Sequence, residues 1–156
     1  MVCALASCGR AWQASASQNM FKEPTNPQAS CKAYVPESLF ETGLGHVVIC
    51  NAQPDGLYAC GIFLVDVFCL GVKNAFYSEV SASQLQEHLG EFSADCGPMK
   101  QIDPVCARKL IQAAVAYAQR IGFTHHRDYK KARKVFRYVP EGDCDTVFTF
   151  GKDGQP

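Results

Sequence analysis

Residues 45–70 read GHVVICNAQPDGLYACGIFLVDVFCL, and the expected architecture can be built outward from them. β-Branched residues are frequent in 45–51, which is typical of a strand. Residues 53–56 (QPDG) carry a turn signal, because proline presets φ and glycine accepts positive φ. Residues 57–70 are apolar on both parities, which indicates a central strand covered on both faces. We therefore expect an antiparallel β-hairpin that ends at Gly71.

A helix is predicted shortly after this hairpin. Ser81 and Gln84 match a capping box, in which each residue satisfies a backbone N–H near the other. Leu85 and Leu89 follow at helical spacing. Gly90 can close the segment, so the pattern predicts a short helix.

The clearest helical pattern runs from Asp103 to Gly122. Asp103 can be the N-cap, and Pro104 suits the first helical position because that position needs no N–H. Apolar residues recur at helical spacing along the segment: Val105, Leu110, Ile111, Ala114, Tyr117, Ala118 and Ile121. Gly122 supplies the stop, and Phe123 is placed to pack back on the last turn.

The last quarter of the chain predicts one more helix and one more strand. The helix is expected over 128–137, before the breakers Pro140 and Gly142. The strand is expected over 145–150 (DTVFTF). A turn signal follows it with no returning strand, which indicates a hairpin cut short or an edge strand.

Together these patterns predict an α+β fold with a small, mainly antiparallel sheet and two or three helices packed on it. The expected order is strand, strand, helix, helix, helix, strand. Serine, asparagine and proline punctuate residues 1–43, which we interpret as an irregular N-terminal arm. Residues 44–156 are then expected to form one α+β domain.

Composition excludes several classes of protein. The chain has 156 residues and is neutral overall, with 15 basic and 15 acidic side chains. An apolar fraction of 47% excludes a disordered chain. No apolar stretch approaches the ~20 residues of a membrane-spanning helix, and the N-terminus lacks the basic start of a secretory signal. We therefore expect a cytoplasmic protein without a membrane partner.

The nine cysteines first suggest a disulfide or zinc framework, but no pair has the C-x-x-C spacing of such motifs. Four of them lie in apolar runs: Cys50, Cys60, Cys69 and Cys106. A thiol in such a run behaves as a small hydrophobe, so the pattern favours reduced, mostly buried thiols. A zinc site built from Cys3, Cys8 and Cys31 is the alternative.

Asp66 is the one charged residue between Asp55 and Lys73, in the middle of the most apolar run. A buried carboxylate has to be paired, hydrogen-bonded, bound to metal or protonated. Asp66 is therefore a candidate metal ligand or acid–base group, with Lys73 as its nearest partner in sequence. The structural alternative is a strand end at which Asp66 accepts hydrogen bonds from backbone N–H groups.

Residues 124–129 (THHRDY) form a second constellation, between two predicted helices. Adjacent histidines cannot easily face one pocket, so we expect at most one of His125 and His126 to act as a ligand or base. Asp128 could orient that imidazole. The structural alternative is that Asp128 or Thr124 caps the following helix and that the histidines are exposed.

A basic run follows directly. Residues 127–137 hold six basic residues and one acidic residue, a local charge of +5, so the rest of the neutral chain carries −5. Four of the basic residues share one helical face: Arg127, Lys130, Lys131 and Lys134. Such a face can bind phosphate groups, although it is more often simply solvated.

Three segments resemble a family of uncharacterised bacterial proteins. They are residues 65–76 (VDVFCLGVKNAF), residues 122–129 (GFTHHRDY) and residues 148–154 (FTFGKDG). The resemblance covers about residues 45–156. In that family proline is typical at the position of His125, which leaves His126 as the matching histidine, and relatives continue beyond the position of Pro156 into another strand. The resemblance implies a shared pattern and no mechanism, because the family has no established activity.

Two classes of function follow. The favoured one is a non-catalytic binding or accessory module whose basic helix contacts phosphate or nucleic acid. The alternative is a metal-assisted hydrolase of the phosphodiesterase or nuclease type. Asp66 and Asp128 would then hold a divalent metal, His126 would act as ligand or base, and Lys73 would complete the candidate catalytic group.

Overall fold

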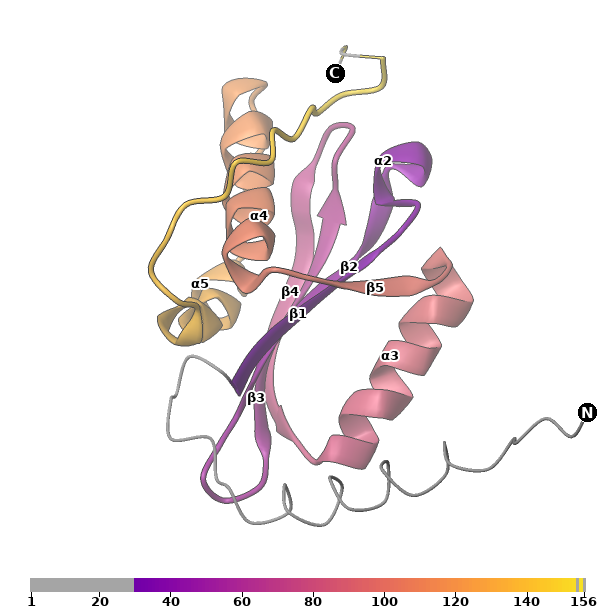
Figure 1. Ribbon diagram of the computed structural model, residues 1–156. Helices are drawn as coiled ribbons and strands as arrows, with labels where there is room; N and C mark the ends of the chain where they lie inside the picture. The colour runs from indigo at the N-terminus through magenta and orange to yellow at the C-terminus, as the bar shows by residue number, and fades with distance from the viewer. Residues whose placement is uncertain (1–29, 154, 156) are drawn as a thin grey trace, which may run out of the picture.

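A five-stranded antiparallel sheet forms the middle layer of the protein (Figure 1). The computed structural model describes residues 30–153 and 155. The strands are β1 (Cys31–Pro36), β2 (Leu44–Ala52), β3 (Tyr58–Asp66), β4 (Gly71–Val80) and β5 (Met99–Ile102). They lie in the order β4-β3-β2-β1-β5. The predicted α+β class with an antiparallel sheet is confirmed.

The predicted hairpin is the pair β2 and β3. The strands are in register with Cys50 opposite Cys60, and Gly56 turns the chain with φ of 83°. The Gly56 N–H donates to the carbonyl of Gln53 at 3.0 Å. However, β3 ends at Asp66 and does not reach residue 70, because the chain turns there toward a further strand.

That further strand, β4, was not expected. Gly71 was expected to end the hairpin, but in the structure it is the first residue of β4. β4 pairs only with β3, and one side of it faces solvent, so polar residues interrupt its apolar pattern. A β-bulge shifts its register: Leu64 lies opposite Asn74 and Val65 opposite Val72. Lys73 is therefore left in the bulge with an exposed side chain.

The expectation of an irregular arm over residues 1–43 is wrong for its described part. β1 is a central strand, in which Ala33 pairs with Ile49 of β2 and with Ile102 of β5. A short helix, α2 (Leu39–Thr42), links it to β2. β1 has six residues, and α2 separates it from β2, so no tight-turn hairpin signal marks it, while its other partner, β5, is distant in sequence. Residues 1–29 lie outside the described part.

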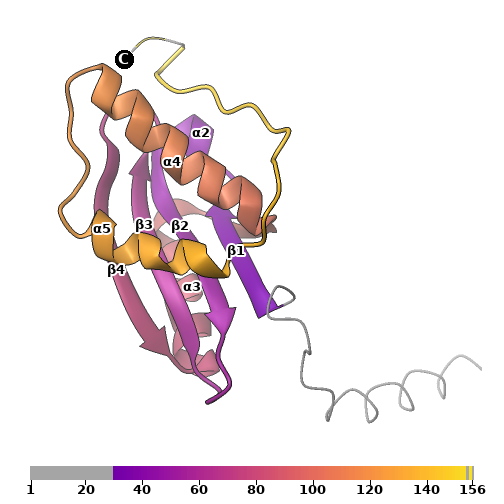
Figure 2. The same cartoon turned by 90° about the vertical axis from the view of Figure 1, so that its left-hand side faces the viewer.

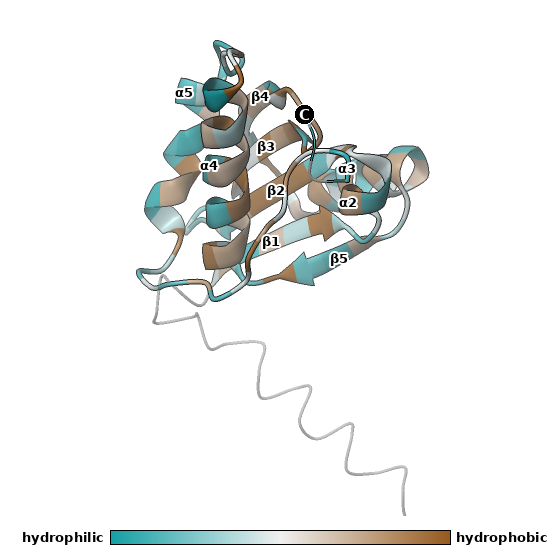
Figure 3. Cartoon of the chain, turned by 90° about the horizontal axis from the view of Figure 1, so that it is seen from above, coloured by the Kyte–Doolittle hydropathy of each residue, from teal (hydrophilic) through white to brown (hydrophobic). Residues whose placement is uncertain are grey.

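Helices cover both faces of the sheet. α3 (Ala82–Cys96) packs on one face, and α4 (Pro104–Arg120), α5 (Tyr129–Ala132) and the 3₁₀-helix η2 (Arg133–Tyr138) pack on the other (Figure 2). In Figure 3 the apolar strands lie between α4 on one side and α3 on the other. The expected order of elements is wrong, since β1, β4 and β5 were missed and the described residues after the helices hold no closing strand.

α3 begins at the predicted capping box but does not end at Gly90. The Ser81 hydroxyl accepts from the Gln84 N–H at 3.3 Å, and the Gln84 side chain accepts from the Ser81 N–H at 2.9 Å. Gly90 lies inside the helix, and a Cβ atom built on it would meet nothing within 4 Å. The helix continues to Cys96 because a solvent-facing glycine weakens a helix without breaking it.

α4 begins and ends as predicted. The Asp103 carboxylate accepts from the Val105 N–H at 2.8 Å, and Pro104 is the first helical residue. At the C-terminus Gly122 has φ of 95°, and the Phe123 N–H donates to the carbonyl of Ala118 at 2.9 Å. This pattern closes the helix as a glycine stop should.

The third predicted helix is present, as α5 followed directly by η2. The strand predicted over 145–150 is wrong, since these residues have no regular secondary structure and pair with no strand of the described chain. The carbonyls of Cys144 and Thr146 are instead taken by the Lys109 ammonium, at 2.6 and 2.8 Å. In the part of the chain that the structure describes, only an isolated bridge, Lys152 with Gln155, follows.

Candidate functional site

The six basic residues of the predicted run are all exposed, on α5, on η2 and in the turn just before α5, and we call them the basic face. They are Arg127, Lys130, Lys131, Arg133, Lys134 and Arg137. Tyr129, Ala132 and Val135 alternate with them and are buried. The amphipathic spacing thus turns every apolar side chain of this group toward the sheet and every cation toward solvent.

α5 and η2, which carry the basic face, pack very closely against the sheet. A Cβ atom on Gly61 of β3 would lie 2.5 Å from Val135 Cγ1, so only glycine allows η2 to approach this far. The Phe63 ring stacks on Phe136 with centroids 5.6 Å apart and meets Tyr129 edge-on at 6.1 Å. Burial raises the pKa of the Tyr129 phenol. The basic face therefore has a rigid, apolar support.

In the described part of the chain, the basic face has no carboxylate in ion-pair contact. Among residues 30–153 and 155, no Asp or Glu oxygen lies within 4.0 Å of a nitrogen of these six side chains. At the far end, the Arg137 guanidinium donates to the Tyr138 hydroxyl at 2.7 Å, and this hydrogen bond raises the pKa of Arg137. The six charges are consequently available to an anionic ligand.

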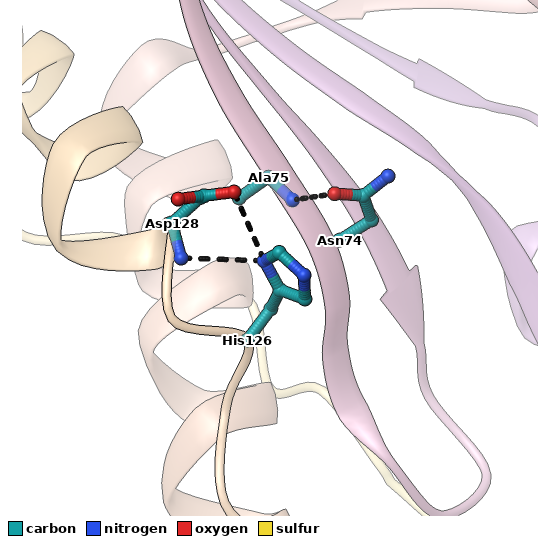
Figure 4. Close-up of polar contacts among 4 residues, drawn as sticks. All are labelled: Asn74, Ala75, His126 and Asp128. Carbon is teal, nitrogen blue, oxygen red and sulfur yellow. Dashed lines mark hydrogen bonds and ion pairs between the residues drawn. The ribbon is translucent and has the colours of Figure 1, made fainter.

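His126 and Asp128 lie together at the start of this element, as Figure 4 shows. The His126 Nδ1 accepts from the Asp128 N–H at 3.2 Å and lies 3.7 Å from the Asp128 carboxylate. The backbone N–H of His126 donates to the Val72 carbonyl of β4 at 3.0 Å. Nearby, the Asn74 side-chain oxygen accepts from the Ala75 backbone N–H. The imidazole thus holds the turn that leads into α5, and the Asp128 side chain makes no capping hydrogen bond.

Asp66 has the structural role that the sequence left open. It is half-buried at the end of β3, where its Oδ1 accepts from the N–H groups of Phe68 and Cys69 at 2.9 and 3.0 Å. Within the described residues no hydrogen bond or ion pair joins Asp66 to Lys73, His126 or Asp128. Lys73 is exposed in the β4 bulge. The four candidate catalytic residues therefore do not form one hydrogen-bonded site.

A metal site at Asp66 and Asp128 lacks further ligands. Over residues 30–153 and 155 there is no cluster of three or more His, Cys, Asp or Glu side chains that could hold a metal ion. Tight protein metal sites usually take three or four protein ligands. No observation in the described residues favours the metal-assisted hydrolase.

The seven described cysteines comprise one disulfide, three buried thiols and two half-buried thiols. Cys106 and Cys144 are joined by a disulfide, so the expectation of a reduced thiol is wrong for Cys106. The two lie 38 residues apart, and only the fold brings them together. Cys50 and Cys60 face each other across β2 and β3 as free, fully buried thiols. A hydrogen bond to Cys60, together with burial, raises the pKa of Cys50.

Cys31 belongs to the same group of buried thiols, and burial raises its pKa to about 11. Thiols of this kind stay protonated at neutral pH and are poor metal ligands or nucleophiles. The alternative zinc site also needs Cys3 and Cys8, which lie outside the described residues. Cys69 and Cys96 are free and half-buried.

Sequence reasoning missed a groove beside α4. Its volume is about 350 Å³, and its walls come from α2, β1, β5, α4 and the segment after Cys144. Phe40 of α2 stacks on Phe148 of that segment with centroids 5.9 Å apart and nearly parallel rings. The alternating DTVFTF pattern does indicate that Phe148 and Phe150 pack inward, but not against what.

The chain was compared with protein-family models, with curated proteins and with solved structures, and none gave a significant match. In the described residues, no helix is both long enough and apolar enough to cross a membrane.

Proposed function

We propose that the protein is a non-catalytic binding module that holds nucleic acid by its phosphates through the basic face. The observation that carries this proposal is the set of six exposed cations that have no carboxylate partner among residues 30–153 and 155. Such a surface loses little by desolvation and releases counterions from a polyanion, which drives binding.

The shape of the basic face favours a polymer over a single phosphate. Its cations lie on the outside of a helix and not in a hollow, and the groove beside α4 is lined by other residues. α5 and η2 together hold ten residues and extend roughly 18 Å, which spans several phosphates of a strand. Phosphate contacts of this kind give affinity without sequence preference.

Titration of labelled DNA and RNA oligonucleotides, followed by fluorescence anisotropy at several salt concentrations, tests the proposal. The variant Lys130→Gln/Lys131→Gln/Lys134→Gln should bind more weakly, and the slope of log K against log salt should fall by about three. The fold should be unaffected, because all three side chains are exposed.

A matched variant separates a local contact from net charge. Lys32→Gln/Lys100→Gln/Lys152→Gln removes the same charge from exposed lysines elsewhere on the protein. It should leave affinity and slope near those of the parent chain. Equal losses in the two variants, or parent binding that does not respond to salt, would show that the basic face is not the contact surface.

A further inference from the structure

The segment of residues 142–153, which we call the strap, lies along α4 without any helix or strand of its own (Figure 1, Figure 2). A few isolated contacts hold it. The Lys109 ammonium binds two of its carbonyls, and the Phe150 ring stacks on Tyr117 with centroids 5.5 Å apart. The Gly151 N–H donates to the Val67 carbonyl at 2.9 Å. Only the disulfide of Cys144 ties the strap covalently to α4.

The strap closes one side of the apolar groove beside α4. Phe148 and Thr146 of the strap line this groove together with Leu39, Ile102 and Leu110. Between these inward residues, Val147 is 85% exposed, so the strap is a single layer of chain with solvent behind it. Its removal would uncover apolar side chains that otherwise belong to the main core.

Reagents in solution can reach the Cys106–Cys144 disulfide, whereas they cannot reach the facing thiols of Cys50 and Cys60. Cys106 is half-buried at the start of α4, whereas Cys50 and Cys60 are completely buried in the sheet. A dithiol reagent can therefore approach the Cys106 sulfur without unfolding the sheet. A segment with few buried contacts and no strand pairing is also the kind that opens locally.

We propose that Cys106 and Cys144 form a redox-controlled latch, which holds the strap over the groove when oxidised and releases it when reduced. This inference is independent of the proposed function. The reductant is a dithiol. Its first thiolate attacks the Cys106 sulfur, and Cys144 leaves as a thiolate that takes up a proton. Its second thiolate then attacks the mixed disulfide, so that Cys106 is released as a thiol and the reagent becomes a disulfide, a two-electron exchange.

Proteolysis of the full chain under native conditions tests the latch. Chymotrypsin cuts after aromatic residues, and Phe148 and Phe150 are such sites in the strap. Treatment with dithiothreitol should speed cleavage there by about tenfold or more, because the open form becomes more populated. Cys144→Ser should be cut at the fast rate with or without reductant. Cys69→Ser, which removes a free thiol elsewhere, should respond as the parent does.

Hydrogen exchange read by mass spectrometry gives the second measurement. On reduction, amides of the strap should lose protection while those of β2 and β3 keep theirs. Three results would overturn the latch: a fully reduced chain whose strap is cut no faster, a loss of protection that includes β2 and β3, or peptide mapping that finds no Cys106–Cys144 link in the oxidised chain.

Discussion

The two faces of the sheet are stabilised in different ways. On one face a single helix of 15 residues, α3, brings its own capping box and covers a small core. On the other face α5 has four residues and η2 has six, beside the 17-residue α4, and neither of these two short elements is long enough to be stable alone. The second face compensates with a larger core and with close approach to the sheet. The comparison teaches that the basic face depends on packing more than on helix propensity.

The largest expected difference between the two faces is in the free energy of unfolding that is lost when one aromatic residue on each face is truncated. Phe63→Ala removes a fully buried ring that contacts Tyr129 and Phe136, and it should lower the free energy of unfolding by about 3–5 kcal/mol. Phe92→Ala on α3 should cost less, because Phe92 lies at the margin of the smaller core, stacked on the half-buried ring of His46. Urea denaturation measures both, and an equal or larger cost for Phe92→Ala would contradict the comparison.

The two faces also predict opposite effects for one small change. Gly61→Ala should destabilise the protein by about 1–3 kcal/mol, because the new methyl group meets Val135 and the Ala132 carbonyl. Gly90→Ala in α3 should stabilise it by about 0.5–1 kcal/mol, because the methyl meets nothing and alanine favours a helix. Thermal or urea unfolding of the pair tests this, and effects of the same sign would show that η2 does not rest on Gly61.

The smallest expected effect is a pH dependence that belongs to the α3 face. Burial lowers the pKa of His46 below its ordinary value of 6.5, although the Asp95 carboxylate opposes the shift. As the pH falls through 6.5, the unfolded chain takes up its proton first, so the free energy of unfolding should decrease until the folded pKa is passed.

Urea denaturation between pH 8 and pH 5 measures this effect. The decrease should be smaller in His46→Gln, which has no imidazole to titrate. It should persist in His88→Gln, which keeps His46 of β2 and changes a more exposed histidine on α3, the helix that packs against it. An unchanged pH profile in His46→Gln would assign the dependence to another group.

Much of the fold is predictable because its signals are local. The cap at Asp103, the stop at Gly122 and the capping box at Ser81 each act within a few residues, and the structure has all three. β1, β4 and β5 were missed because their partners are distant or because one side of the strand is polar. The disulfide could not be derived, since spacing alone does not give connectivity.

Only part of the candidate site could be predicted from the sequence, and again it was the part with a local signal. The exposure of the basic face follows from helical spacing: its four named cations are all exposed, Lys130 and Lys131 on α5, Lys134 on η2 and Arg127 in the turn before α5. A catalytic group at Asp66 was suggested by charge in an apolar run, but the run ends there and the carboxylate binds backbone N–H groups. The groove and the strap depend on contacts between distant segments, which no local pattern reports.

The bulge that leaves Lys73 unpaired has a consequence for solubility. Strand margins carry free N–H and C=O groups that can recruit strands of other molecules and seed aggregation. At the β4 edge, the bulge with Lys73 breaks the regular row of backbone groups. The backbone N–H of His126 also donates to the Val72 carbonyl there. At the other margin, β5 has only four residues. The β5 edge is therefore a short template, while at the ten-residue β4 edge the bulge and the His126 backbone contact interrupt the first residues of the strand.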